Sequence, residues 1–207
     1  MANICKSTAE NIKLMPSSNK HRPQKMLYEE KLKRKEENRV LRQYKQQQRV
    51  FLMTSRFNNK TIEENRRFRE TSWKAGCVYC TPEQVSQSIP LQSKLFVLEM
   101  NNDTNHIVGV GMCLNKSFSE KYSVYQENNF NRYNYIGKYR IEREDLNAEE
   151  EAVFKALDIL CFTGNYHMKR GQGLKLFPLQ LLLNCEKVLN ITEYVEKMFS
   201  TRFQKKI

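Results

Sequence analysis

Glycine, proline and tryptophan are scarce in this chain, and long apolar runs are missing. The 207 residues include 7 Gly, 5 Pro and 1 Trp. No apolar segment approaches the roughly 20 residues that a membrane-spanning helix needs, and the N-terminal segment MANICKSTAENIKLM lacks the apolar core of a secretory signal. We therefore expect an intracellular protein that has no membrane partner.

Disulfides are not expected either, because cysteines in a chain without a secretory signal are usually thiols in a reducing compartment. Six cysteines are present. Cys77 and Cys80 form a C-x-x-C pair, which is a spacing that zinc sites use, but a second ligand pair at a recognisable spacing is missing. We favour structural thiols, with zinc at Cys77 and Cys80 as the alternative, and we expect no cofactor.

The common catalytic motifs are also missing. The sequence contains no G-x-x-x-x-G-K-[ST], no G-x-G-x-x-G, no H-E-x-x-H and no G-x-S-x-G. These absences favour a binding protein over an enzyme. The enzymatic alternative is a nuclease or base-processing enzyme in which His167 moves a proton and Lys169 or Arg170 stabilises the phosphorane.

Positive charge is abundant and unevenly distributed. Lys and Arg number 35 against 23 Asp and Glu, a net charge of +12, and residues 1–50 hold 13 of these cations against 5 acids. Such a balance favours nucleic acid, RNA or DNA, as the partner. We expect a basic, flexible or partly helical arm over residues 1–49 and a single folded domain over residues 50–207. The arm either docks on nucleic acid or is simply solvated.

Hydrophobic patterns predict an α+β fold with about five strands and four helices around a small, curved, mostly antiparallel sheet. Residues 94–100 and 106–114 predict a hairpin. Thr61 is expected to cap a helix. Gly109 and Gly111 leave one face of their strand open to the close approach of a helix or a ligand. The five main strands are expected at 50–55, 94–100, 106–114, 121–126 and 133–141, with 77–80 as a candidate for a further short strand. The helices are expected at 61–74, 148–162, 176–189 and 191–203.

The segment from residue 122 to residue 140 interleaves aromatic rings, cations and amides. Rings can stack on exposed bases, cations can hold phosphates, and amides can read base edges. A tyrosine-rich strand pair with a hydrated outer face is the structural alternative. The residues that we expect to bind nucleic acid here are Arg132, Tyr133, Tyr135, Lys138 and Arg140.

A second candidate is the loop at residues 163–173, TGNYHMKRGQG. Its glycines and adjacent cations could let backbone N–H groups cradle a phosphate, with His167, Lys169 and Arg170 as the binding residues. The alternative is a basic surface turn with glycine in left-handed positions. Trp73, the single tryptophan, is expected to anchor the core or to form one wall of a base pocket.

Two resemblances to known families add to these expectations. The strings MTSRFNNKTIEENRRFRE, CVYCTPEQVSQSIP, KLFVLEMNNDTNHIVGVGMCLN, NFNRYNYIGKYRI and FTGNYHMKRGQG resemble a family of uncharacterised proteins from large DNA viruses of eukaryotes, over about residues 50–203. That resemblance implies an intracellular viral setting, in the host cytoplasm or nucleus or in the virion. Over residues 70–141, the order of Trp73, Cys80, Ile89-Pro90 and the two strong strands is similar to PUA-like domains of the EVE and YTH types.

The PUA-like resemblance implies a small curved sheet, which can close into a barrel, and an aromatic pocket that holds a flipped or modified nucleotide. We therefore expect a nucleic-acid-binding protein whose arm adds nonspecific phosphate affinity. A viral structural or assembly protein is a further alternative, in which the basic arm neutralises packaged genome.

Overall fold

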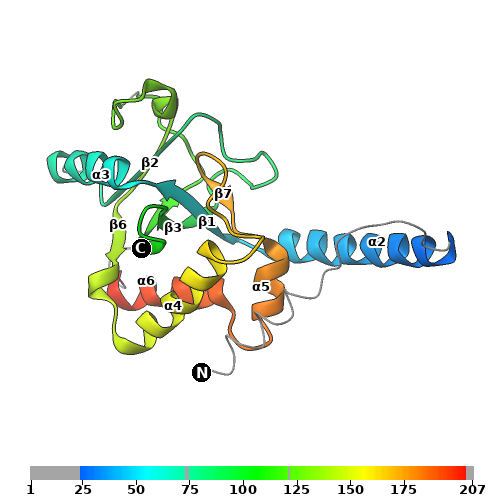
Figure 1. The fold of residues 1–207 in the computed structure, drawn as a ribbon. Coiled ribbons are helices and arrows are strands. Elements are labelled where there is room, and N and C mark those ends of the chain that lie inside the picture. The colour runs from blue at the N-terminus through cyan, green and yellow to red at the C-terminus, as the bar shows by residue number, and fades with distance from the viewer. Residues whose placement is uncertain (1–23, 73–74, 121, 204–207) are drawn as a thin grey trace. The chain divides into compact units, whose positions relative to one another are not determined.

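The computed structural model describes residues 24–72, 75–120 and 122–203. The chain divides into two units, residues 1–47 and residues 48–207 (Figure 1). The described part of the first unit is helix α2 (Gln24–Gln47), in which every side chain from residue 28 to residue 40 is exposed. This helix agrees with the run of helix formers, free of Gly and Pro, that the sequence shows there.

A five-stranded sheet forms the centre of the second unit, with the strand order β6–β4–β3–β1–β7. Strands β3 and β4 form the antiparallel hairpin that the sequence predicts. Strands β1 and β3 are parallel, whereas the other neighbouring pairs are antiparallel. The strands are β1 (Val50–Phe57), β3 (Lys94–Asn101), β4 (His106–Leu114), β6 (Tyr139–Glu142) and β7 (Lys175–Leu176).

A second sheet consists of only two strands, β2 (Cys77–Thr81) and β5 (Tyr133–Gly137), which pair antiparallel. It packs against β4, where the Gly137 backbone approaches the Met112 carbonyl too closely for a side chain at position 137. The expected single strand at residues 133–141 is therefore wrong. It divides at Lys138 into β5 and β6, which belong to different sheets.

The strand expected at residues 121–126 is also wrong over the part that the structure describes, residues 122–126, which are irregular. The backbone N–H groups of Val124 and Tyr125 donate to Asn131 Oδ1, at 3.1 and 3.0 Å, instead of to a neighbouring strand. The short 3₁₀ helix η1 (Asn128–Asn131) positions this amide.

Helix α3 (Asn59–Thr71) begins two residues before Thr61, the expected cap. Asn58 is the N-cap, because its Oδ1 accepts from the Thr61 N–H at 2.8 Å, while Thr61 Oγ1 accepts from the Asn58 N–H at 3.0 Å. Thr61 therefore has the third-residue role in this capping box and not the capping role.

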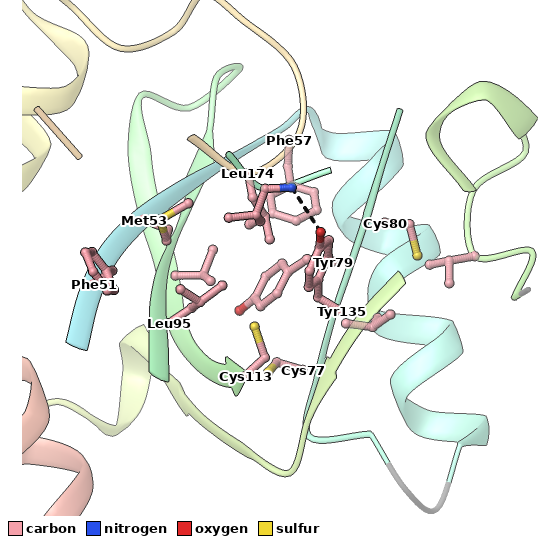
Figure 2. Packing of buried hydrophobic residues seen from close by; sticks show 14 of the residues in the cluster. Phe51, Met53, Phe57, Cys77, Tyr79, Cys80, Leu95, Cys113, Tyr135 and Leu174 are labelled. Atoms are coloured by element: carbon pink, nitrogen blue, oxygen red, sulfur yellow. Dashed lines mark hydrogen bonds between the residues drawn. The ribbon is translucent and has the colours of Figure 1, made fainter. Parts of the chain in front are cut away.

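Helices and the small sheet cover opposite faces of the large sheet. Helix α4 (Ala148–Phe162) contacts β4, and α6 (Ile191–Phe203) contacts β1, β3 and β6, with α5 (Leu179–Cys185) against α6. The Phe96 and Phe199 rings, 4.8 Å apart, join these two layers. On the other face, the β2–β5 sheet and α3 close over a cluster of buried side chains that includes Met53, Leu95 and Tyr135 (Figure 2).

The fold is therefore α+β, with a mostly antiparallel sheet and helices at residues 148–162 and 191–203 where the sequence predicts them. The helix expected at residues 176–189 is shorter, because only Leu179–Cys185 is α-helical. The described sheet is open, with β6 and β7 at its edges. The 3₁₀ helix η2 (Arg143–Asp145) links β6 to α4.

Candidate nucleic-acid interface

A buried carboxylate, Glu99 of β3, holds Arg140 inside the protein. Arg140 Nε lies 3.0 and 2.9 Å from the two carboxylate oxygens, Nη2 lies 2.6 Å from Oε2, and both side chains are about 5 % exposed. Tyr79 Oη donates to the same carboxylate at 2.8 Å. Arg140 also pairs with Glu142 at the edge strand. The structure therefore places Arg140 in an internal network and not on a binding surface.

The two glycines of β4 make room for this network. A Cβ at position 109 would lie 2.7 Å from Arg140 Nη2, and one at position 111 would collide with Tyr79 Oη. The open strand face that the sequence predicts is thus filled by the protein's own guanidinium and phenol. Burial alone would lower the pKa of Arg140, but the charge and hydrogen bonds of Glu99 outweigh it and leave the pKa raised.

Tyr135 also lies inside the core. It is 2 % exposed, and its Oη accepts the Val85 N–H at 3.0 Å, the hydrogen bond drawn in Figure 2. Burial raises the pKa of this phenol. A base could stack on Tyr135 only if the core opened, because the ring belongs to the buried cluster. Tyr135 is consequently left out of the interface that we describe.

The remaining β5 candidates reach the surface. Arg132 and Lys138 are exposed, Tyr133 is half-buried, and neither cation has a carboxylate within 4 Å among the described residues. Arg132 and Tyr133 lie at the start of β5, whereas Lys138 lies beyond its end. They therefore cannot all contact the same phosphate.

The loop at residues 163–173 is held in place by residues that the sequence analysis does not single out. Arg56 Nε donates to the Met168 carbonyl at 2.7 Å, and Asn102 Nδ2 donates to the Lys169 carbonyl at 3.1 Å. Lys169 Nζ donates to Asn105 Oδ1 at 2.8 Å. Strand β1 and the β3–β4 turn thus fix a loop that follows them by more than sixty residues. No local pattern in the sequence signals these contacts.

The loop presents positive charge without negative charge. Neither His167, Lys169 nor Arg170 has a carboxylate within 4 Å in the described part of the chain, and Arg170 is exposed. Gly171, with φ +102°, has open space where a side chain would be. Residues 170–173 direct no backbone N–H to an acceptor among the described residues. Cations and free N–H groups together are the chemistry that binds an anion.

The end of this loop meets the start of β5 at Thr81. The Gly173 backbone lies against the Thr81 side chain, and Thr81 pairs with Tyr133 in the small sheet. The structure therefore brings Arg132 and Tyr133 near the loop and separates them from Lys138 by the length of β5. We call Arg132, Tyr133 and the 163–173 loop the interface edge.

Histidine chemistry has little support at this edge. His167 Nδ1 accepts the Lys169 N–H at 3.4 Å, and no described carboxylate lies within 4 Å to orient the ring. His106 Nδ1 lies 3.0 Å from Asp158 Oδ2, on the α4 side of the large sheet, where Asp158 also pairs with Arg143. A general acid or base needs such an orienting partner for efficient proton transfer.

Cys77 and Cys80 are buried thiols on opposite faces of β2. Burial raises the pKa of each thiol to about 12, so both are protonated near neutral pH. Within residues 24–72, 75–120 and 122–203, no group of three His, Cys, Asp or Glu side chains is arranged to hold a metal ion. Trp73 lies outside the described residues.

Comparisons with known proteins provide no relative. No family model matches the chain, and no curated protein and no solved structure matches it. The viral and PUA-like resemblances therefore stay predictions. Among the helices that the structure describes, none combines the length and apolar character needed to cross a membrane.

Proposed function

We propose that the protein binds nucleic acid through phosphate contacts made by unpaired cations of α2 and of the interface edge. The observation that carries this proposal is how the cations are distributed. Inside the folded unit, Arg140, Arg143 and Arg202 are each bonded to carboxylates. On the described part of the surface, exposed cations with no carboxylate within 4 Å include two groups, one on α2 and one at the interface edge.

The first group lies on α2. Its members are exposed and have no carboxylate within 4 Å among the described residues. They are Lys31, Lys33, Arg34, Lys35 and Arg42. A helix of 24 residues with few apolar contacts is only marginally stable alone. Phosphates lying along it would neutralise the repulsion between these side chains and stabilise the helix.

The second group is the interface edge. Arg132, Lys169 and Arg170 add charge there, and the free N–H groups of residues 170–173 add directed donors. Because this loop is fixed by Arg56 and Asn102, it needs little ordering when it binds, and less affinity is lost to entropy.

We propose further that the folded unit is related to PUA-like domains and takes a flipped or modified nucleotide. The support is the close packing of the β2–β5 sheet on β4 at Gly111 and Gly137. The described sheet differs from a closed barrel, because β6 and β7 are open edges.

The test is the salt dependence of binding. Fluorescence anisotropy would follow the full chain on labelled single-stranded RNA and DNA between about 50 and 200 mM salt, where each phosphate contact contributes about 0.7 to the logarithmic slope. Replacing Lys169 and Arg170 together by glutamine should lower the slope by about 1.4 if both contact phosphate. The matched control replaces the exposed Lys155 and Lys187 by glutamine, and should leave the slope unchanged.

A parallel variant, Lys31→Gln with Lys33→Gln and Lys35→Gln, should weaken binding to every sequence by the same factor, because phosphate contacts read no sequence. Binding that depends on α2 and ignores Lys169 and Arg170 would favour the genome-neutralising assembly protein. Absence of binding at the lowest salt would refute the proposal for both groups.

A further inference from the structure

Segment 117–119 extends the small sheet by one residue on its outer side. The Phe118 N–H donates to the Asn134 carbonyl at 2.8 Å, and the two residues form an antiparallel bridge. Asn134 is also paired with Cys80 on β2. Residues directly opposite each other in antiparallel strands present their side chains on the same face. Phe118, Asn134 and Cys80 therefore form a row on the face opposite to Tyr79 and Tyr135.

Asn134 differs from the other buried amides of this region. Asn131 uses both ends of its side chain, because Oδ1 accepts two backbone N–H groups and Nδ2 donates to the Tyr125 carbonyl at 2.6 Å. Asn134 is 1 % exposed, and its Nδ2 donates to the Glu120 carbonyl at 3.2 Å. Its Oδ1 has no hydrogen-bond partner among the described residues.

Rotating the amide by half a turn would not remove this anomaly. It would place Oδ1 against the Glu120 carbonyl, so that two acceptors face each other, and would leave Nδ2 without an acceptor. A buried acceptor without a partner costs roughly tenfold or more in the folding equilibrium. Such a group in a folded protein calls for a specific explanation.

The groups around Asn134 are better suited to binding a nucleobase than to binding a phosphate. Phe118, on the same face, is 48 % exposed although it is a large apolar side chain. Glu120 contributes both the carbonyl that accepts from Asn134 and a carboxylate that accepts from Tyr122 Oη. A free acceptor beside a half-exposed ring fits a flat molecule that carries an N–H donor, and it offers no hydrogen bond to a phosphate oxygen, which is itself an acceptor.

We propose that Asn134 and Phe118 form a nucleobase site, in which Oδ1 accepts a hydrogen bond from an exocyclic amino group and the base stacks on the Phe118 ring. This inference rests on the proposed function, because it supplies the base contact of the same ligand. Tyr133 precedes Asn134, and its partner Thr81 contacts Gly173 of the phosphate loop. Thr81 and Tyr133 share the face of Tyr79 and Tyr135, so the loop and Asn134 lie on opposite faces of the small sheet, and a nucleic-acid strand bound at both would have to cross the sheet near the start of β5. Because Oδ1 is buried, a base can reach it only when a neighbouring side chain moves aside. Phe118 is the side chain of this row that is half-exposed, and we expect it to move.

The experiment changes the base and the amide together. The full chain is titrated with single-stranded oligomers of adenine and of purine, which lacks only the 6-amino group, and with oligomers of cytosine and of its analogue without the 4-amino group. Each titration is repeated with Asn134→Leu and with the control Asn129→Leu, at an exposed asparagine of the same segment. In the native chain, at least one amino-bearing oligomer should bind about three- to tenfold more tightly than its analogue.

Asn134→Leu should reduce that ratio to about one, while Asn129→Leu keeps it. Phe118→Ala should weaken binding of the preferred oligomer about fivefold or more through lost stacking, whereas Leu91→Ala, at another exposed apolar residue, should not. The salt slope should stay constant in all four variants, which separates this inference from the phosphate contacts.

Equal affinity of the native chain for both members of each pair would overturn the inference even if Asn134→Leu failed to fold. A ratio that survives in a folded Asn134→Leu variant would overturn the assignment to Asn134. Binding with a normal salt slope but without amino-group discrimination would leave the proposed function standing and remove only the base site.

Discussion

Replacing Gly111 by alanine tests how tightly Tyr79 and Cys77 pack against this glycine in the buried network around Glu99. A Cβ at this position would collide with Tyr79 Oη and would lie 2.6 Å from Cys77 Cβ and 2.8 Å from Cys77 Sγ. The phenol is the end of a rigid side chain that is 1 % exposed and bonded to Glu99 at 2.8 Å. It therefore cannot move aside without giving up that hydrogen bond.

The magnitude follows from two losses. A hydrogen bond to a charged group contributes about 1.5 to 3 kcal/mol, and overpacking a dense core costs about 1 to 3 kcal/mol. Gly111→Ala should therefore lower the free energy of unfolding by about 3 to 5 kcal/mol. For a folded unit of this size, that is a fall of roughly 6 to 20 °C in the unfolding midpoint.

Chemical denaturation monitored by circular dichroism would measure this in a double-mutant cycle with Tyr79→Phe. Removing the hydroxyl alone should cost about 1.5 to 3 kcal/mol, because Glu99 loses a donor. In that background the Gly111→Ala change should cost less, by about 1 to 2 kcal/mol, because the colliding oxygen is gone and only the Cys77 contacts remain.

Gly164→Ala is the matched control. A Cβ at that position would meet nothing within 4 Å, so the change should cost only about 1 kcal/mol of backbone strain from its positive φ. Additive effects of Gly111→Ala and Tyr79→Phe, or a Gly111→Ala loss as small as that control, would refute the packing described for this network.

The elements that the sequence predicts well have their apolar period and their boundary signals within the same short segment. Helix α4 spans Ala148–Phe162, the range that the sequence predicts, because the acidic first turn and the apolar stripe agree with each other, and the structure adds an Asn147 cap. The β3–β4 hairpin likewise follows from two apolar runs around a polar turn. Neither prediction required a partner distant in the sequence.

The division of residues 133–141 could not be predicted in this way. Its alternating pattern continues through Gly137 and Lys138, and the break is set by the close approach of the Gly137 backbone to Met112 on β4. The sequence also suggested that Tyr135 and Arg140 lie on the surface and bind nucleic acid, because the contacts that bury them are made by residues distant in the sequence. Their buried partners, Val85 and Glu99, lie about 40 to 50 residues away, and the neighbouring Glu142, which also pairs with Arg140, does not by itself show that the guanidinium is buried.

The interface edge was partly predictable. Glycines and cations marked the 163–173 loop, but its anchors Arg56 and Asn102 and its meeting with Thr81 are tertiary contacts. Asn134 was one of several amides in an asparagine-rich segment. Only the hydrogen-bond partners of each amide distinguish it from Asn131, which holds the backbone of the preceding loop.

Two further predictions concern the stability of the folded unit. Asn147 Oδ1 accepts from the N–H groups of Glu149 and Glu150 at 3.0 Å, so Asn147→Ala should cost about 1 kcal/mol, or roughly 2 to 4 °C in the unfolding midpoint. The control Asn165→Ala, at an exposed loop residue, should cost little, and equal losses would contradict the cap. The buried thiols Cys80 and Cys161 have pKa values raised by burial to about 12, against about 8.5 in an unfolded chain. Because the folded state favours the protonated thiol, this contribution is complete below about pH 8.5 and is lost as the pH rises toward 12. The unfolding midpoint, measured by calorimetry, should therefore fall between about pH 8.5 and pH 10, and it should fall less in a Cys80→Ala, Cys161→Ala variant, because alanine has no proton to release. The same pH dependence in both proteins would show that these thiols are not protected by burial.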